Sequence, residues 1–316
     1  MSIHVFIDGQ AGTTGLQVAE KLAHHELVSL ITLDEASRKD NTARQAAYDK
    51  ADVAILCLPD EAAREAAHLS QNSDVILIDA STAHRTDEAW VYGMAEVSPA
   101  QKQAIAKAKR ISNPGCYPTG FLAMVAPLRA AGLLDEQALL NVPAISGYSG
   151  GGKGLIEAFD ANQTPRHFTY GHNLAHKHIP EMQKMAGLVH APLFMPSVGD
   201  FAQGMLVHLP LFASQLTKTA TAEDVASIYQ AHYQDSPLIT AYNANEMRHH
   251  NASGFLAADG LKETDKLEIF TTYNEQTSQF WLTARLDNLG KGASGAAVQN
   301  MNIALGLNET TGLVCE

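Results

Sequence analysis

One cysteine of the chain stands at a sharp turn directly before an apolar run. Cys116 lies within Ser112–Gly120, whose sequence is SNPGCYPTG, and a helix is expected from Thr119 to Ala131. Pro118 fits the first turn of that helix, because its fixed φ suits a helix and its missing N–H is not needed there. A thiol at this point faces unpaired N–H groups and the positive end of the helix dipole, which favour the thiolate.

The helix dipole alone does not make this thiol a nucleophile. It contributes about 0.3–1 kcal/mol, less than one pKa unit, so a cationic or hydrogen-bonding partner is also needed. Most free cysteines are small buried hydrophobic residues, and that is the competing interpretation. The turn residues on both sides of Cys116 favour a catalytic nucleophile.

Two histidines offer an acid/base partner for such a thiol. His176 and His178 are two residues apart, so in an extended chain they share one face, and Pro180 then opens a helix with Glu181 in its first turn. A histidine there could serve as the acid/base that thioester chemistry requires. A metal site made together with His172 and a purely structural histidine pair remain as alternatives.

A glycine loop follows the first expected strand. Its sequence from Gly9 to Gly15 is GQAGTTG, with glycines at positions 9, 12 and 15 and the hydroxyl residues Thr13 and Thr14 between the last two. Glycines at this point let the backbone turn tightly and approach a pyrophosphate, which the N–H groups of the following helix then hold. The spacing differs from the G-x-G-x-x-G fingerprint, so the loop alone is a moderate signal for a dinucleotide.

The end of the second expected strand carries charges of both signs. Asp34 and Glu35 suit the free 2′-hydroxyl of NAD, whereas Arg38 and Lys39 suit a 2′-phosphate. We favour NADP, because two adjacent cations with Ser37 beside them offer charge-assisted hydrogen bonds to a phosphate. A merely solvated loop is the competing interpretation.

Four further residues are candidates for binding an anion or lining the cofactor pocket. Lys153 lies in the glycine-rich run Ser146–Gly154, and Asn288 precedes the last expected helix. Arg85 follows the fourth strand, where parallel sheets place ligands, and Cys57 ends the third strand as a packed residue on the nucleotide side. A structural role explains Lys153, Arg85 and Asn288 equally well.

The first third of the chain alternates strands and helices, which predicts a parallel sheet covered by helices on both faces. The expected strands are Ile3–Ile7, Val28–Leu33, Val53–Leu58 and Val75–Asp79, and the expected helices are Thr14–His25, Thr42–Ala51, Asp60–Ser70 and Ala100–Lys109.

Beyond about residue 135 the pattern changes to strands without a helix between each pair, namely Leu139–Ile145, Gln203–Leu211, Leu267–Tyr273 and Phe280–Leu286. That pattern predicts an α+β domain with a largely antiparallel sheet. A small-residue helix, Gly295–Leu307, ends the chain.

Composition sets the broad class. The chain has 316 residues, long for one core, and its formal charge of −12 argues against nucleic acid or an anionic membrane as a partner. Its three cysteines lie far apart and build neither a disulfide framework nor a four-thiolate metal site. No signal peptide and no membrane span are expected, so we expect a soluble cytoplasmic protein.

Taken together, these motifs resemble the short form of the N-acetyl-gamma-glutamyl-phosphate reductase family, over nearly the whole chain. The resemblance is carried by the glycine loop and the cysteine turn, by SGYSG at Ser146–Gly150, by HKHIPE at His176–Glu181 and by DNLGKGASG at Asp287–Gly295. The cysteine motif is specific to this family among semialdehyde dehydrogenases, while the glycine loop is common to all of them. The chain departs from the longer forms at Lys153, where they carry arginine.

The resemblance implies an NADPH-dependent reduction of N-acetyl-L-glutamyl 5-phosphate to N-acetyl-L-glutamate 5-semialdehyde and phosphate, a step of arginine biosynthesis. It implies a Rossmann-type NADP-binding domain, residues 1–116 joined by the C-terminal helix 289–316, and a catalytic and oligomerisation domain, residues 117–288. A homo-oligomer, dimer or tetramer, is expected. A sister reductase for aspartyl or aminoadipyl phosphate, a nucleotide-binding regulator and a histidine-site metalloenzyme are the alternatives.

The resemblance also assigns roles to residues, with Cys116 and His178 as the catalytic pair and no metal site. The residues expected to bind the cofactor are Gly9, Gly12, Thr13, Thr14, Gly15, Ser37, Arg38, Lys39, Cys57, Pro59, Ser149, Gly150 and Asn288. Those expected to bind the acyl-phosphate substrate are Arg85, Asn113, Lys153, His176 and Glu181.

Overall fold

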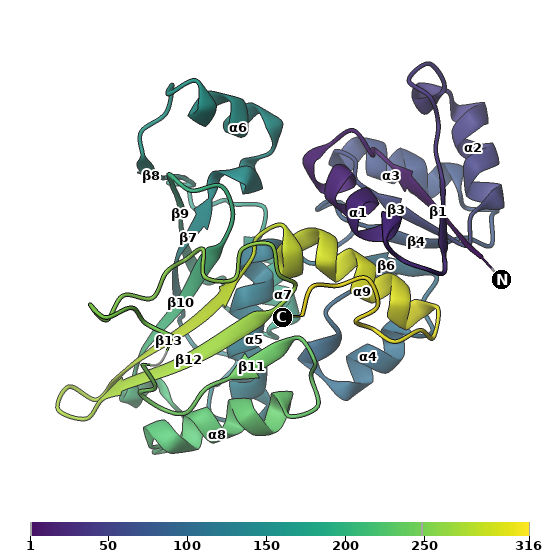
Figure 1. Cartoon of the computed structure of the whole chain (residues 1–316). Coiled ribbons are helices and arrows are strands. Elements are labelled where there is room, and N and C mark those ends of the chain that lie inside the picture. Colours follow the sequence, from purple (N-terminus) through teal and green to yellow (C-terminus); the bar gives the residue numbers. More distant parts are fainter. Residues whose placement is uncertain (1, 248, 316) are drawn as a thin grey trace. The chain divides into compact units, whose positions relative to one another are not determined.

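The chain forms two compact units in a computed structural model that describes residues 2–247 and 249–315. Of the described residues, the first unit holds 2–115 and 293–314, and the second holds 116–247, 249–292 and 315 (Figure 1). Positions 1 and 316, the outer ends of the expected domain ranges, lie outside the described residues. No helix in the described ranges is long and apolar enough to cross a membrane.

The first unit contains a parallel sheet in the order β2-β1-β3-β4-β6-β5. Its strands are β1 (Ile3–Asp8), β2 (Val28–Ile31), β3 (Val53–Leu56), β4 (Ile76–Asp79), β5 (Val91–Tyr92) and β6 (Arg110–Ser112). Its helices are α1 (Thr13–Ala23), α2 (Asn41–Lys50), α3 (Asp60–Leu69), α4 (Pro99–Ile105) and α9 (Gly295–Ala304).

Both faces of this sheet are buried, as the parallel arrangement requires. Val5 and Ile55 pack in one core with residues of α1, α4 and α9. Their chain neighbours Phe6 and Ala54 point the other way and pack in a second core with residues of α2 and α3. The Rossmann-type expectation is therefore confirmed. Helix α9 lies in this unit.

The second unit contains a mixed, mostly antiparallel sheet in the order β11-β12-β13-β10-β7-β9-β8. Its strands are β7 (Asn141–Gly147), β8 (His167–Thr169), β9 (Leu193–Gly199), β10 (Met205–Phe212), β11 (Ile239–Ala241), β12 (Leu267–Asn274) and β13 (Gln279–Leu286). Among the described strand pairs of this second sheet, only β7–β9 and β11–β12 run parallel. The antiparallel expectation is confirmed.

Of the four strands expected here, only β12 and β13 follow each other without a helix between them. Helices α6 (Lys153–Asp160) and α7 (Ile179–Met185) lie between β7 and β9, and α8 (Ala222–Tyr233) follows β10. The start of α7 was expected from Pro180, whereas α6 and α8 were missed, although α6 is amphipathic and α8 begins with a capping box at Thr221. The cysteine helix also differs from expectation: α5 (Cys116–Ala130) begins at the cysteine itself, three residues before Thr119.

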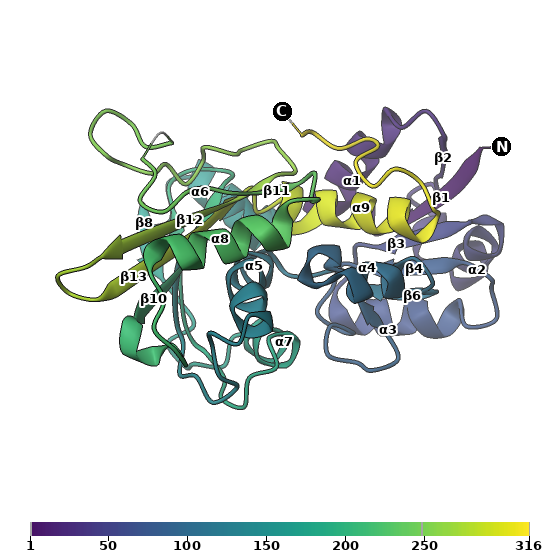
Figure 2. The same ribbon diagram turned by 90° about the horizontal axis from the view of Figure 1, so that it is seen from below.

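One face of the second sheet is covered by α5 and α8 (Figure 2). Tyr229 and Tyr233 of α8 donate hydrogen bonds to backbone carbonyls of α5, each at 2.8 Å. On α5, a Cβ at Gly120 would lie 2.7 Å from the Val207 side chain of β10, so glycine lets the helix approach the sheet closely. This packing fixes the helix that begins at Cys116.

The opposite face of this sheet is divided. Near one end, Glu268 and Arg285 form a buried ion pair, at 2.8 Å between Nε and Oε2, beneath residues 242–247 and 249–260. Toward the other end, side chains are exposed around a hollow of about 610 Å³. We call this part the open sheet face, and the strand register places on it Asn141, Pro143, Leu193, Met195, His208, Pro210, Phe212, Thr272, Asn274, Gln279 and Trp281.

Candidate functional site

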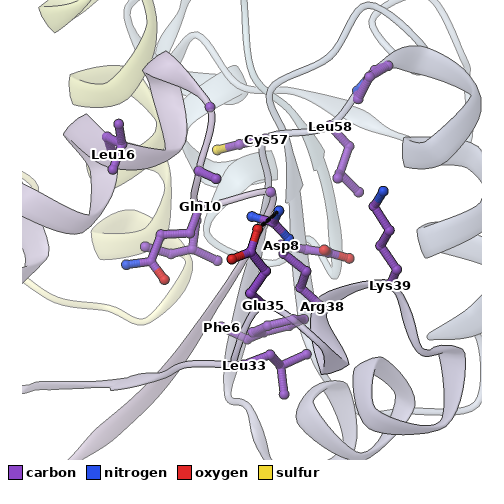
Figure 3. Close-up of a pocket in the computed structure, with 15 residues that line it drawn as sticks. Phe6, Asp8, Gln10, Leu16, Leu33, Glu35, Arg38, Lys39, Cys57 and Leu58 are labelled. Carbon is purple, nitrogen blue, oxygen red and sulfur yellow. Dashed lines mark hydrogen bonds and ion pairs between the residues drawn. The ribbon is translucent and has the colours of Figure 1, made fainter.

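The first unit carries a hollow of about 600 Å³ at the carboxyl ends of β1, β2 and β3 (Figure 3). It brings together six of the expected cofactor-binding residues, namely Gly9, Gly12, Arg38, Lys39, Cys57 and Pro59. Parallel sheets of this class bind dinucleotides at such strand ends. Thr13, Thr14 and Gly15 begin α1 beside the hollow, and Ser37 begins the 3₁₀ helix η1 (Ser37–Lys39).

The glycine loop leaves no space for side chains at two positions. Gly9 has φ +89°, and a Cβ there would lie 2.3 Å from the Cys57 carbonyl oxygen. A Cβ at Gly15 would lie 2.5 Å from the Gly9 carbonyl oxygen. Gly12 caps α1 with no side-chain hydrogen bond, so the N–H groups of the first helical turn are left to an anion. These features fit the pyrophosphate of a dinucleotide.

The charged residues after β2 have different tasks. The Asp34 carboxylate accepts the backbone N–H of Ser37 at 2.8 Å, and hydrogen bonding from Ser37 lowers the pKa of Asp34. Asp34 therefore holds the backbone of Ser37, the first residue of the 3₁₀ helix. Glu35 instead lines the hollow and pairs with Arg38, at 2.8 Å between Oε1 and Nη2.

A buried carboxylate that sequence reasoning missed forms part of the wall of this hollow. Asp8, the last residue of β1, accepts hydrogen bonds from Arg44 Nε at 3.0 Å and Nη2 at 2.9 Å, and from the Tyr48 hydroxyl. Burial and the neighbouring Asp8 charge raise the pKa of Tyr48 far above its usual value. Arg44 and Tyr48 are four residues apart on α2, so they lie on one face of that helix. Asp8, the partner of both, lies 36 residues before Arg44 in the sequence, so the spacing on α2 does not reveal it.

Arg85 and Asn113 meet in the first unit. Arg85 Nε donates to the Asn113 carbonyl oxygen at 2.9 Å, and its Nη2 donates to the Ala80 carbonyl oxygen at 3.1 Å. The Asn113 side chain donates to the Ala293 carbonyl oxygen at 3.0 Å and accepts from Asn300 at 3.0 Å. Both expected substrate residues are buried, and these bonds hold the segment that leads to the cysteine turn.

In the second unit, Cys116 lies against a glycine. A Cβ added at Gly292 would be 2.8 Å from the Cys116 Cβ, so the turn Asp287–Gly292 passes directly over the cysteine. The Gly292 N–H closes that turn by donating to the Asp287 carbonyl oxygen at 2.9 Å. In the sequence this turn was singled out because of Asn288, and the requirement for glycine at position 292 was not predicted.

Three expected cofactor residues of the second unit also meet. Asn288 Nδ2 donates to the Ser149 hydroxyl at 3.0 Å, and its Oδ1 accepts the Gly204 N–H at 2.9 Å. A Cβ at Gly150 would lie 3.3 Å from Asn288 Nδ2. Lys153 is separate from this group: its side chain is 83% exposed and pairs with Glu157 at 3.7 Å.

The histidine pair packs around Tyr117, the residue that follows Cys116. The rings of His176 and His178 are 4.8 Å apart, and the Tyr117 ring lies 6.5 Å from the first and 6.0 Å from the second. The Tyr117 hydroxyl donates to the Ser197 carbonyl oxygen at 3.1 Å and accepts from the Tyr170 hydroxyl at 3.4 Å. Neither tyrosine was assigned a role from the sequence, although Tyr117 directly follows Cys116.

The two histidines differ in their environment. His176 Nδ1 accepts the backbone N–H of His178 at 3.1 Å, so this nitrogen carries no proton. Burial, followed by the charge of Lys177, lowers the pKa of His176 to about 4. His176 is therefore neutral at neutral pH, while His178 and Glu181 are buried at the start of α7.

The described residues contain no group of three or more histidine, cysteine, aspartate or glutamate side chains arranged to hold a metal ion. His172, the third member of the metal alternative, contacts Thr169 Oγ1 at 3.0 Å.

Two family models match the chain. The model described as semialdehyde dehydrogenase, NAD binding domain, matches residues 4–105, and the model described as semialdehyde dehydrogenase, dimerisation domain, matches residues 116–288. The chain is 45% identical to an N-acetyl-gamma-glutamyl-phosphate reductase of Trichormus variabilis over 98% of each chain. It is 44% identical to one of Allorhizobium ampelinum, over 96% of this chain and 99% of the relative.

Solved structures show the same fold at low sequence identity. Aspartate semialdehyde dehydrogenase II of Vibrio cholerae, complexed with ASA, is 16% identical with a TM-score of 0.72, covering 96% of this chain and 98% of the other. The aspartate semialdehyde dehydrogenase of Francisella tularensis is 13% identical with a TM-score of 0.73, covering 95% and 99%.

The environments of the cysteines predict an order of alkylation. Burial and the nearby carboxylates of Asp79 and Asp8 raise the pKa of the Cys57 thiol to about 12, so almost none of it is thiolate at neutral pH. We expect substoichiometric iodoacetamide to modify Cys116 first, and Cys57 at least about a hundredfold more slowly. Peptide mass mapping over time measures both rates, with Cys315 as the internal reference. Faster labelling of Cys57 than of Cys116 would refute the assignment.

Proposed function

Because the chain belongs to the N-acetyl-gamma-glutamyl-phosphate reductase family, we propose that it reduces N-acetyl-L-glutamyl 5-phosphate with NADPH, giving N-acetyl-L-glutamate 5-semialdehyde and phosphate in arginine biosynthesis. It is an oxidoreductase of the phosphorylating semialdehyde dehydrogenase class. The observation that carries the proposal is Cys116 at the start of α5, in a chain 44–45% identical to such reductases along almost its whole length.

Cys116 is the proposed nucleophile. Its thiolate attacks the acyl carbon, the bond from that carbon to the phosphate oxygen breaks, and a thioester remains on the protein. When bound, the reduced nicotinamide supplies the hydride that the thioester accepts. A thioester suits this step because sulfur is a strong nucleophile when ionised and a good leaving group afterwards.

His178 is the proposed acid/base. It donates a proton to the oxygen of the tetrahedral adduct and takes it back as the C–S bond breaks, which returns the thiolate and releases the aldehyde. His176 is a poorer candidate, because its lowered pKa of about 4 leaves it neutral and its Nδ1 already accepts the backbone N–H of His178. We assign His176 to orienting His178 and, with Glu181, to binding substrate.

NADP is proposed over NAD because Arg38 and Lys39 line the same hollow as the glycine loop. A 2′-phosphate there gains charge-assisted hydrogen bonds from both cations. Ser149, Gly150 and Asn288 are proposed to contact the cofactor from the second domain. The domain roles follow as proposals: residues 1–116 with 289–316 bind NADP, and residues 117–288 carry catalysis and oligomerisation.

Three further residues are proposed to bind the substrate: Arg85, Asn113 and Lys153. The buried bonds of Arg85 and Asn113 to backbone support a role in holding the cysteine turn as much as in direct binding. Lys153 is exposed and starts a helix, so it would have to act as a mobile cation. We place the reaction in the cytoplasm, in keeping with the three widely separated cysteines.

The open sheet face is proposed as the contact with a second copy of the chain. It lies within residues 116–288, matched by the model of a dimerisation domain, and it exposes large apolar side chains: Phe212 and Trp281 are each 57% exposed, Leu193 43% and Met195 42%. Contiguous apolar patches of this kind mark interaction sites.

The substrate proposal is tested by running the reaction backwards. We expect N-acetylglutamate semialdehyde with phosphate and NADP⁺ to give NADPH at a rate at least about a hundredfold above that with aspartate semialdehyde, because acyl specificity is a difference in transition-state binding. Cys116→Ser should abolish turnover and leave binding of 2′,5′-ADP unchanged. An equal or faster rate with aspartate semialdehyde would contradict the proposal.

The acid/base assignment predicts different pH profiles for two variants. His178→Asn should lower kcat by about 10²–10⁴-fold and remove the titration near neutrality, the usual result of losing a general acid/base. His176→Asn should cause a smaller loss and keep that titration, since His176 is already neutral there. The profiles are measured side by side with saturating substrate. If only His176→Asn removes the titration, the two roles must be exchanged.

The proposed contact between two copies of the chain through the open sheet face is tested by measuring the molecular mass of variants in solution. We expect Trp281→Glu to reduce the oligomer to a smaller species at low micromolar concentration, because it buries a charge in an apolar contact. Leu27→Glu is the matched control, an exposed apolar residue of the first unit at 44% exposure. Light scattering after size-exclusion chromatography measures the masses. An unchanged mass for Trp281→Glu with intact folding would rule out this face.

A further inference from the structure

One buried carboxylate holds the turn that passes over Cys116. Asp287 follows β13 directly and is 1% exposed. Its Oδ1 accepts the backbone N–H groups of Leu289 at 2.8 Å and Gly290 at 3.3 Å. Its carbonyl oxygen accepts the N–H of Gly292 at 2.9 Å. The side chain and the backbone of this one residue therefore shape the whole turn.

The second carboxylate oxygen of Asp287 binds a different segment of the second unit. Oδ2 accepts the backbone N–H of Glu263, 24 positions earlier in the chain. Glu263 has φ +64°, in the left-handed region that a residue other than glycine seldom adopts. The two segments lie in close contact, because a Cβ at Gly290 would be 2.0 Å from the Thr264 carbonyl oxygen. Asp287 thus fastens the turn to the segment that contains Glu263.

The two ends of this turn carry groups that are proposed to act in the reaction. At one end, Asn288 donates to the Ser149 hydroxyl at 3.0 Å, and both are proposed to contact the cofactor. At the other end, Gly292 lies against Cys116, the proposed nucleophile. The separation between these two groups is set by the turn, and Asp287 holds the turn.

The surroundings of Asp287 combine three features that are costly for an ordinary turn. Burial raises the pKa of Asp287 above its usual value, and the charge of Asp265 adds to that effect. Glu263 is held in a left-handed conformation, and a π-helix, Gly290–Ser294, begins within the turn. Departures of this kind from regular, low-energy structure cluster at functional sites.

We propose that Asp287 is a positioning residue for hydride transfer, which holds the thioester on Cys116 at a fixed separation from the cofactor group of Asn288 and Ser149. The inference rests on the proposed function. Asp287 acts through the turn and not on the reacting atoms, so its replacement should slow hydride transfer and leave the nucleophilicity of Cys116 nearly unchanged. A displacement of about 1 Å in such a geometry lowers a rate by up to about a hundredfold.

The test is the first turnover in the oxidative direction, without phosphate. Cys116 adds to N-acetylglutamate semialdehyde, hydride passes from the adduct to NADP⁺, and a thioester and NADPH remain, which gives a single burst of NADPH. We expect Asp287→Asn to slow this burst about ten- to a hundredfold in stopped-flow absorbance. Asparagine offers one acceptor oxygen where the carboxylate offers two, so one of the two segments loses its partner. Partial unfolding would lower the amplitude of the burst and not its rate, so a fall in amplitude alone overturns the inference.

Alkylation of Cys116 separates positioning from nucleophilicity and needs no cofactor. We expect iodoacetamide to modify Cys116 in Asp287→Asn at a rate within about threefold of the parent, because the fraction of thiolate controls that rate. If alkylation slows as much as the burst does, the variant acts on the thiolate and the inference is overturned.

A second aspartate that binds backbone provides the matched control. Asp224 accepts the N–H of Thr221 at 2.9 Å at the start of α8, in the same unit. Asp224→Asn should leave the rate of the burst unchanged. If Asp287→Asn does not fold, Asp287→Glu decides in the same way, because it keeps the charge and moves the carboxylate by one methylene.

The outcomes distinguish this inference from the proposed function. If the parent protein forms the burst and Asp287→Asn forms it at the same rate, the inference fails and the proposed function stands. If the parent forms it only with aspartate semialdehyde, the substrate proposal fails and the variant is judged with that aldehyde. A parent protein that forms no burst with either aldehyde would overturn both together.

Discussion

The ion pair between Asp8 and Arg44 is the contact on which the nucleotide side of this chain depends. Asp8 ends the strand that leads into the glycine loop, and Arg44 comes from the helix that follows the charged segment after β2. Arg44 also donates to Asn41 at 3.0 Å, at the first residue of that helix. One carboxylate thus ties the glycine loop to the charged segment after β2. Leaving it without a partner would cost about 3–5 kcal/mol, as removal of one member of a buried pair does.

The chemistry of the site depends on what the protein suppresses as much as on what it activates. Burial keeps Cys57 protonated with a pKa of about 12, and it keeps His176 neutral with a pKa of about 4. Cys57 lies beside Gly9, which is proposed to bind the cofactor. His176 lies beside His178, the proposed acid/base. Of the two cysteines and two histidines singled out by the motifs, one of each is therefore held inert by its surroundings.

Much of the fold was predictable because its signals are local. The glycine loop, the first helix and strands β12 and β13 lie within two residues of their expected ends, since glycine positions and alternation of side chains are local properties. Asp8 and Arg44 were not found, because a contact between residues 36 apart leaves no pattern in the sequence. The requirement for glycine at 292 arises in the same way, from a neighbour 176 positions earlier. Helices α6 and α8 were missed although local signals exist for both, an amphipathic pattern in α6 and a capping box at the start of α8.

The two tryptophans of the chain stand in contrasting surroundings, one in each unit. Trp90 stacks on the His84 ring at 4.1 Å in the first unit. Trp281 lies on the second sheet and donates its indole N–H to His208 Nδ1 at 2.9 Å, a ring that burial keeps neutral by lowering its pKa to about 4. Each unit therefore contains its own fluorophore beside an imidazole. Single replacement of either indole by phenylalanine gives a protein whose remaining tryptophan emission, excited selectively over tyrosine, reports on one unit alone without any added dye.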